Sequence, residues 1–430
     1  MVHGIHPSRA AIQESQLEQL RSLVAELFPG NAFYTKKLSA AGVTFDIASL
    51  ADFSQRFPLT TKSEVVTDQR VHPPFGTNLT YPLECYTRFH QTSGTTGIPL
   101  RWLDTSESWD WMLESWTEVY RAAGVTAADR IYFAFSFGPF LGFWLAFEAG
   151  NRLGALCLPG GGTGSAARLC ALIDNGATVL CCTPTYAVRL AEVAAEEQID
   201  LRRARVKTII VAGEPGGSIP AMRARLAALW PGARLFDHHG MTEVGPVTHE
   251  CPVQPGVLHV IESAYYPEVI DPLTDQPSPM GHAGELVLTT LGRTGSPLLR
   301  YRTGDLVKLE RSASPCACGR NDATLPGGIL GRTDDMLVVR GVNIYPSAVE
   351  EILRAAAGVA EYQVRISEVS ALIEMSIQIE PRPECADATA LAERLEKDFQ
   401  ASLSLRIPIT VVPFGTLPRF EMKAKRWVRG

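Results

Sequence analysis

The chain has 430 residues, of which 46% are hydrophobic and 20% are charged, and its formal net charge is −6. This balance is typical of a globular protein, and the length favours a large domain joined to a smaller one. The negative charge argues against nucleic acid or an anionic membrane as the main partner, because both attract cationic surfaces.

The sequence contains no segment typical of secretion or membrane insertion. Its most apolar stretch, residues 140–150, is too short to span a bilayer, and the first residues lack an apolar run of signal-peptide length. The nine cysteines are an odd number and are scattered along the chain, unlike a disulfide framework. We therefore expect a soluble, cytoplasmic protein without nucleic-acid or membrane partners.

The first 85 or so residues read as helices and loops, since residues 15–28 have a helical period and residues 58–65 resemble a capped helix start. The middle of the chain alternates short apolar runs with helical segments, which predicts right-handed crossovers and a buried parallel sheet. Ligand loops should follow the carboxyl ends of its strands. The expected strands lie within residues 130–138, 154–162, 177–184 and 206–215, and the expected helices within 165–176 and 219–232.

Two later changes of pattern divide the rest of the chain. Residues 266–309 contain shorter segments with many turns, which predicts an antiparallel subdomain. The final hundred residues read as strand, helix, strand, strand, helix and strand, enough for a compact α+β module. We expect an α/β protein with a large domain of residues 1–333, containing mostly parallel sheets flanked by helices, and a small α+β domain of residues 334–430.

A loop of hydroxyls and glycines at residues 92–97, Thr-Ser-Gly-Thr-Thr-Gly, is suited to binding phosphate. Glycine lets backbone N–H groups approach an oxyanion closely, and the hydroxyls donate further hydrogen bonds. A simple turn would use the same residue types. A P-loop would continue with Lys, but Ile98 follows here, so the positive charge that a polyphosphate needs must come from elsewhere.

Three further polar clusters are compatible with nucleotide chemistry. Glu243 follows an expected strand and offers a carboxylate for Mg²⁺, although it could be an ordinary solvated glutamate. Asp305 follows Gly304 and could accept hydrogen bonds from two ribose hydroxyls, which alone is a weak signal. The basic residues around Lys423, near residue 430, also fit a frayed basic tail.

Five segments, in this order, resemble motifs of the adenylate-forming superfamily, which contains acyl-CoA synthetases, peptide-synthetase adenylation domains and luciferases. Within it the sequence is most similar to the phenylacetate-CoA ligase group. With residues 211–217, the resemblance covers the chain from about Lys62 onward. The five segments are SGTTGIP (93–99), HHGMTE (238–243), YRTGDL (301–306), GRTDDMLVVRGVNIYP (331–346) and PRFEMKAKR (418–426).

The resemblance implies an ATP site assembled from these motifs. The phosphates would lie on the 93–97 loop, the adenine beside residues 213–215, and the base against His239, where the family usually has Tyr. Thr242 would contact the α-phosphate, Asp305 the ribose, and Arg332 the ribose or phosphate side. The implied ATP- or AMP-binding residues are Ser93, Gly94, Thr95, Thr96, Gly97, Gly213, Glu214, Pro215, His238, His239, Gly240, Met241, Thr242, Asp305 and Arg332.

The resemblance also implies a two-step reaction. A carboxylic acid would attack ATP to give an acyl adenylate and pyrophosphate, and coenzyme A would then take the acyl group and release AMP. Thr242, Glu243 with bound Mg²⁺, and Lys423 would be catalytic, and a mobile small domain would rotate about Asp334 between the steps. Met422 departs from the family, which usually has Gly before this lysine.

The family builds its acyl pocket in a segment that is rich in aromatic residues here, which favours an aryl or arylacetic acid. The alternative is that most of these side chains are sheet and helix core. The glycines in the segment would leave room for a ring. The expected pocket residues are Phe135, Phe137, Gly138, Phe140 and Gly142, beside Phe143 and Trp144.

A closed structural zinc site needs four soft or borderline ligands, and the sequence offers four, Cys251, His259, Cys316 and Cys318. The two pairs are far apart in sequence, so they could also be unrelated, and His249 is the alternative histidine. Similar cysteines recur in the phenylacetate-CoA ligase group, which favours zinc.

The sequence is also compatible with two other functions. The adenylate could pass to the phosphopantetheine thiol of a carrier protein instead of free coenzyme A. The departures at Ile98 and Met422 would also fit a non-catalytic protein that binds a nucleotide or acyl adenylate. A homodimer is possible for each of these readings.

Overall fold

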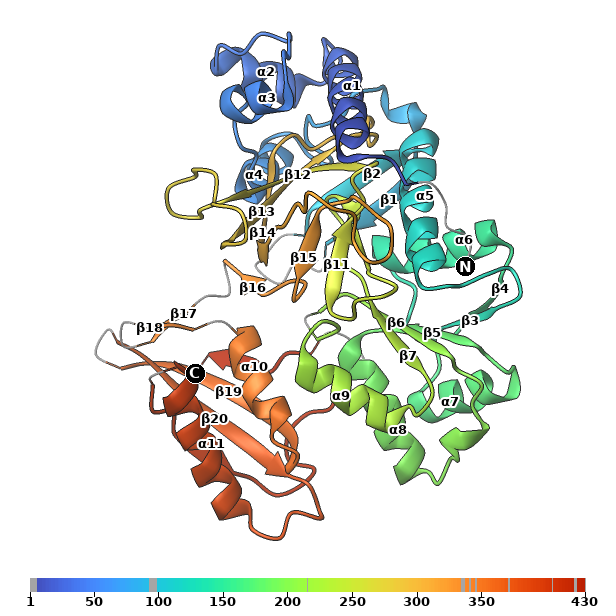
Figure 1. The fold of residues 1–430 in the computed structure, drawn as a ribbon, viewed down its shortest axis with the longest axis vertical. Coiled ribbons are helices and arrows are strands. Elements are labelled where there is room, and N and C mark those ends of the chain that lie inside the picture. Colours follow the sequence, from blue (N-terminus) through green and yellow to red (C-terminus); the bar gives the residue numbers. More distant parts are fainter. Residues whose placement is uncertain are drawn as a thin grey trace.

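The computed structural model describes residues 6–92, 99–214, 216–333, 337–339, 342–344, 346–369, 372–403, 405–420 and 424–429 (Figure 1). Several expected site residues lie outside this part of the chain. They are Ser93, Gly94, Thr95, Thr96 and Gly97 of the phosphate loop, Pro215, Asp334 and Lys423.

The N-terminal region is helical, as predicted. It contains α1 (Arg9–Leu27), α2 (Ala32–Ala40), α3 (Leu50–Arg56) and α4 (Lys62–Val71). Each helix begins after a side chain that accepts a backbone hydrogen bond from its first turn, which satisfies an otherwise unpaired N–H group. At α4 the cap is a complete capping box between Thr61 and Glu64, which fixes the backbone just before Lys62.

Residues 130–237 contain a five-stranded parallel sheet with strand order β4-β3-β5-β6-β7. The strands are β3 (Arg130–Phe133), β4 (Leu156–Pro159), β5 (Val179–Cys182), β6 (Thr208–Val211) and β7 (Arg234–Asp237). Strands β3, β4, β5 and β6 lie within the four predicted segments, and β7 lies outside them. The helices between and before them are α5 (Ser106–Ala122), α6 (Leu141–Leu153), α7 (Ser165–Asp174), α8 (Pro184–Glu196) and α9 (Pro220–Leu229).

Alternate residues of these strands enter different cores, because successive side chains of a strand point to opposite faces. Ile131 and Phe133 pack with α5 and α6, whereas Tyr132, between them, packs with α7, α8 and α9. Helices therefore cover both faces of the sheet (Figure 1), and its strands are apolar on both sides.

The other strands of the large domain are antiparallel. The predicted subdomain is a four-stranded sheet of order β12-β13-β14-β16, and a second sheet has the order β10-β11-β15. Two short hairpins accompany them. The strands are β1 (Tyr86–Gln91), β2 (Arg101–Thr105), β8 (Gly240–Met241), β9 (Gly245–Pro246), β10 (Thr248–Glu250), β11 (Val257–Val260), β12 (Tyr265–Ile270), β13 (Ala283–Thr290), β14 (Tyr301–Lys308), β15 (Thr324–Pro326) and β16 (Gly331–Arg332).

The C-terminal region has its own core beneath a sheet of order β21-β20-β19-β22. Residues 427–429 form β22, parallel to β19, so they are not the frayed tail that their composition also allowed. The fold class is therefore confirmed, and the boundary at 333/334 stays a prediction. The elements are β17 (Leu337–Val339), β18 (Val342–Ile344), α10 (Pro346–Ala355), β19 (Val359–Val369), β20 (Leu372–Pro381), α11 (Ala388–Leu403), β21 (Ile409–Val411) and β22 (Trp427–Arg429).

Among the described residues, no helix combines the length and the apolar character needed to cross a membrane.

Candidate active site

Several of the expected site residues that the structure describes lie on loops at one end of the parallel sheet. Strand β3 has β4 on one side and β5 on the other, so the chain reverses its direction of winding there. In open α/β sheets ligands bind outside the carboxyl ends of the strands at such a point. The loops that leave β3, β6 and β7 carry residues 134–140, 212–214 and 238–243 respectively. The acyl-pocket, adenine and magnesium motifs therefore start from the same edge.

Asp305 is the centre of a polar network in this region. It lies opposite Arg332 in the β14–β16 ladder, and the Arg332 Nη1 atom is 2.8 Å from Asp305 Oδ1. On the other side, His239 Nε2 is 3.1 Å from Asp305 Oδ2. Burial would raise the pKa of the Asp305 carboxyl, but the electrostatic attraction of His239 and Arg332 and the hydrogen bond from Arg332 outweigh it and hold that pKa below its ordinary value. The structure thus joins three of the predicted nucleotide residues.

Gly304 makes room for this network. Its φ of +77° lies in the left-handed region, and a Cβ atom added there would come within 2.8 Å of Arg332 Nη2. Glycine therefore satisfies both the backbone angle and the close approach of the guanidinium.

Glu243 lies beside a cation that sequence reasoning did not assign to the site. The Lys62 Nζ atom is 3.2 Å from Glu243 Oε1, and the Glu243 side chain is almost completely buried. Lys62 is the first residue of α4, so the capping box described above fixes its backbone. The motif TTKSE could reveal the helix start, but nothing in it indicates contact with a residue so distant in sequence.

The backbone that carries Thr242 and Glu243 rests on a buried ion pair, which sequence reasoning also missed. Arg293 Nη1 donates to the carbonyl oxygens of Thr242 at 2.9 Å and Glu243 at 2.8 Å. Its Nε and Nη2 atoms each donate to the Asp104 carboxylate at 2.7 Å, and both side chains are fully buried. The sequence signal for this pair was Asp104, a charged residue that directly follows the apolar residues Trp102 and Leu103.

The side chain of His238 points away from Asp305 and into the core. Its ring packs edge-on against Trp116 with the centroids 4.3 Å apart, and its Nδ1 atom lies 3.2 Å from the carbonyl oxygen of Thr248. Burial lowers the pKa of His238 to about 3, so the ring is neutral near pH 7. Gly240 and Met241 form β8 in the same loop, and Gly213 and Glu214 follow β6.

The expected acyl-pocket residues form a contiguous aromatic cluster after β3. Phe135 stacks on Phe143 with ring centroids 4.2 Å apart, and Phe137 lies 5.5 Å from Phe135. At Gly138 an added Cβ atom would meet the ring of Phe140 at 3.2 Å, whereas at Gly142 it would meet nothing within 4 Å. The open space in this cluster is therefore at Gly142.

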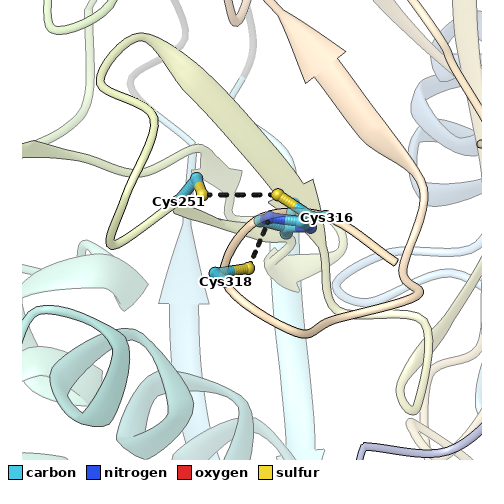
Figure 2. Close-up of side chains that lie close together, drawn as sticks. Cys251, Cys316 and Cys318 are labelled. Atoms are coloured by element: carbon cyan, nitrogen blue, oxygen red, sulfur yellow. Dashed lines mark hydrogen bonds between the residues drawn. The ribbon is translucent and has the colours of Figure 1, made fainter. Parts of the chain in front are cut away.

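The four predicted metal ligands lie together, and Figure 2 shows the three cysteines among them. Cys251 follows β10, His259 lies in β11, and Cys316 and Cys318 lie on the loop before β15. The ligand atoms are all within 4.8 Å of one another, with Cys251 Sγ 3.7 Å from Cys316 Sγ and Cys318 Sγ 3.4 Å from His259 Nε2. His249 lies opposite His259 in the ladder, but its Nδ1 atom contacts the carbonyl oxygen of Glu250.

This spacing fits a tetrahedral zinc ion. Bonds of about 2.3 Å to sulfur at tetrahedral angles would place two sulfur atoms about 3.8 Å apart. A disulfide would require about 2.05 Å between them. Three thiols and one imidazole also match the donor types that zinc prefers.

Comparison with known proteins matches both parts of the chain. Residues 89–292 match the AMP-binding enzyme family, and residues 341–429 match the AMP-binding enzyme C-terminal domain. The phenylacetate-coenzyme A ligase of Thermus thermophilus is 32% identical, over 96% of this chain and 95% of its own length.

Among solved structures, 2-hydroxyisobutyryl-CoA ligase is similar in two of its states. Its postadenylation state with 2-HIB-AMP superposes with a TM-score of 0.93, at 28% identity over 100% of this chain and 93% of that one. The state with 2-HIB-AMP and CoA, described as the thioesterification state, gives 0.74, at 30% identity over 99% and 91%. The same ligase thus gives the higher score in its postadenylation state, so the overall arrangement of this chain is more similar to that state than to the other.

Proposed function

Because this chain belongs to the phenylacetate-CoA ligase group of the AMP-binding enzymes, we propose that it converts an aryl or arylacetic acid into its coenzyme A thioester, with ATP as the energy source. The enzyme class is that of the AMP-forming acid–thiol ligases. The acid is first joined to AMP, and the acyl group then passes to the thiol.

The observation that carries this proposal is the Asp305 network. His239 comes from the loop after β7, Asp305 from β14 and Arg332 from β16, yet His239 and Arg332 both contact the carboxylate of Asp305. Asp305 is ionised near pH 7 and accepts hydrogen bonds, as recognition of two ribose hydroxyls requires. Arg332 supplies a fixed positive charge next to it.

In the first step a carboxylate oxygen of the acid attacks the α-phosphorus of ATP, and the bond to the β-phosphate oxygen breaks to release pyrophosphate. Two anions must meet, so positioning and charge neutralisation supply most of the catalysis. Lys423 would bridge the acid and the α-phosphate as a compact positive charge. The Thr242 hydroxyl would donate to the same phosphate, and its backbone is held by Arg293.

Glu243 is the proposed magnesium ligand. It offers a buried carboxylate on the loop after β7, and a site with one protein carboxylate suits Mg²⁺, which takes its other ligands from phosphates and water. A bound ion would neutralise phosphate charge. Lys62, 3.2 Å from the same carboxylate, is placed to supply the local positive charge that Ile98 does not.

In the second step the sulfur of coenzyme A attacks the acyl carbon, and the bond to the adenylate oxygen breaks to release AMP. We propose that the small domain first rotates about Asp334, which withdraws Lys423 and admits the thiol. The two superpositions on 2-hydroxyisobutyryl-CoA ligase support this, since that ligase has distinct arrangements for its two states.

The aromatic cluster supports an aromatic acid. Phe135 and Phe137 are half-buried and lie in contact with each other, and rings of this kind bind a flat apolar group by stacking and edge contacts. The relative from Thermus thermophilus, named for phenylacetate, points the same way.

The cysteine cluster is proposed to hold one structural zinc ion. With Cys251, His259, Cys316 and Cys318 as ligands, a tetrahedral ion has no position left for water, so it would not activate a nucleophile. It would instead tie the loop before β15 to β10 and β11.

The decisive test is a screen of carboxylic acids with ATP and coenzyme A, read by mass spectrometry, beside acid-dependent exchange of labelled pyrophosphate into ATP. We expect aryl and arylacetic acids to support exchange and to yield thioesters. Pyrophosphate exchange without formation of a coenzyme A thioester would instead favour a carrier-protein thiol as the acceptor of the acyl group. If no acid supports exchange, the protein is not a ligase.

A further inference from the structure

The carboxylate of Glu214 accepts hydrogen bonds from the large domain and from the C-terminal segment. Its Oε1 atom accepts from the backbone N–H of Thr185 at 2.8 Å, and its Oε2 atom accepts from the backbone N–H of Ala424 at 3.1 Å. Thr185 lies in the first turn of α8, whereas Ala424 directly follows Lys423 in the sequence. We call this pair of contacts the Glu214 bridge.

The bridge is favoured by its surroundings in the large domain. The first N–H groups of a helix have no partner within the helix and carry a partial positive charge, so a carboxylate at the start of α8 is stabilised. Hydrogen bonds to an ionised acceptor are also stronger than neutral ones. The large domain therefore holds Glu214 in place, with its second oxygen available to Ala424.

A second contact links the same two segments. Arg426 Nη1 donates to Thr185 Oγ1 at 3.3 Å, while Arg426 Nε donates to Glu361 of β19 at 2.7 Å. The Arg426 side chain is only 5% exposed, so it is fixed within the small domain. Residues 424–426 thus meet the large domain at two points, Glu214 after β6 and Thr185 at the start of α8.

These contacts exist in an arrangement of domains like that of the postadenylation state. In that state the segment next to Lys423 must lie near the ATP site if Lys423 acts in the first step. A rotation toward the second arrangement would move Ala424 and Arg426 away from α8 and would break both contacts.

We propose that Glu214 is a positioning residue, which holds the segment that carries Lys423 against the large domain while the acid is adenylated. It acts through the backbone of Ala424, which fixes where the neighbouring lysine can reach. This role differs from that of a residue that contacts the adenine, and it rests on the two-step reaction proposed above.

Hydrogen–deuterium exchange tests the bridge without any catalysis. In Glu214→Gln the amide group cannot accept from both N–H groups, and in Glu214→Ala neither bond remains. We expect a peptide that spans residues 424–429 to exchange about tenfold faster in both variants, as for the loss of one hydrogen bond. The exchange rates of peptides from β19 and β20 should not change in these variants. In the control variant Glu197→Gln, which alters an exposed glutamate just after α8, the peptide 424–429 should exchange as in the unsubstituted protein. Unchanged exchange at residues 424–429 would overturn the proposal.

Kinetics of the separate half-reactions test the consequence. We expect Glu214→Gln to lower kcat for adenylation on the order of 10- to 100-fold at saturating ATP, because small misplacements of a reacting group have such effects. Thioester formation from supplied acyl adenylate should stay within about twofold of the unsubstituted protein, since the bridge is open in that step. Thr185→Val removes only the contact with Arg426, so it should lower kcat for adenylation by a smaller factor and leave thioester formation unchanged.

Other outcomes have distinct meanings. A raised KM for ATP and for the acyl adenylate, with kcat unchanged, would assign Glu214 to nucleotide binding and overturn the positioning role. Equal loss of both half-reactions would indicate general structural damage and would also overturn it. If the unsubstituted protein supports no exchange of pyrophosphate, the proposed function fails, while the deuterium experiment still decides whether the bridge exists.

Discussion

Arg293 and Asp104 form a fully buried ion pair directly beneath the backbone of Thr242 and Glu243. The pair connects β2 with the segment after β13, and its guanidinium also binds the two carbonyl oxygens above it. The position of the proposed catalytic loop therefore depends on a charge in the core.

Asp104→Asn should destabilise the protein by about 3–5 kcal/mol, because it leaves the Arg293 charge buried without a counter-ion. Denaturant unfolding followed by circular dichroism measures this. The matched control is Glu114→Gln, which breaks the exposed pair with Arg121 and should cost at most about 1 kcal/mol. If both variants lose the same free energy of unfolding, the buried pair contributes no more to stability than the exposed one.

Lys62→Ala should raise the KM for ATP in pyrophosphate exchange, on the order of tenfold, because one charge-assisted contact to a phosphate would be lost. Lys36→Ala, on the exposed side of α2, should have no effect. If Lys62→Ala leaves the KM for ATP unchanged, Lys62 is only the ion-pair partner of Glu243.

Lys423→Ala should abolish most adenylation and leave thioester formation from supplied acyl adenylate nearly intact, since the lysine is proposed to act in the first step alone. Measuring the two half-reactions separately provides the comparison. A similar decrease in both would contradict the assignment of Lys423 to one state.

Stability should depend on pH through His238. Because burial lowers its folded-state pKa from 6.5 to about 3, the unfolded chain binds a proton that the folded protein does not between these two values. The folded state therefore loses stability as the pH falls from about 6.5 toward 3. The difference in unfolding free energy between the unsubstituted protein and His238→Gln should shrink over that range. A difference independent of pH would refute this account.

Metal analysis of the purified protein should give about one zinc per chain. The double variant Cys316→Ser with Cys318→Ser should lose the metal and unfold at a lower temperature, because ligand binding to the folded state contributes to its stability. Cys170→Ser, an exposed cysteine on α7, should keep the metal and serves as the control. Unchanged zinc content in the double variant would exclude this site.

Much of the architecture could be predicted because its signals are local. The parallel strands are short apolar runs that end in Gly or Pro, and the helices between them have clear ends, so β3 to β6 with α7 and α9 were identified from sequence. Strands such as β8 and β9 have two residues each, too few to show a period. Their existence depends on pairing that the sequence does not display.

Individual site residues could be predicted where they lie in motifs that resemble a family. Contacts between residues far apart in the sequence could not be predicted. Asp305 and Arg332 were each expected near the nucleotide, but their mutual contact was not. Arg293 and Asp104 are 189 positions apart, and only the fold shows that they meet. Lys62 was missed for the same reason, although its helix start was correctly expected.

The segment around Lys423 is anchored within the small domain on both sides. Before it, Arg419 pairs at 2.7 Å with Glu380, which is fully buried in β20, and after it β22 adds to the edge of β19. The described residues on both sides of position 423 are thus fixed to the small domain, so a swing of that domain as one body would carry them with it. Turnover limited by that swing would slow in proportion to the viscosity of the solvent.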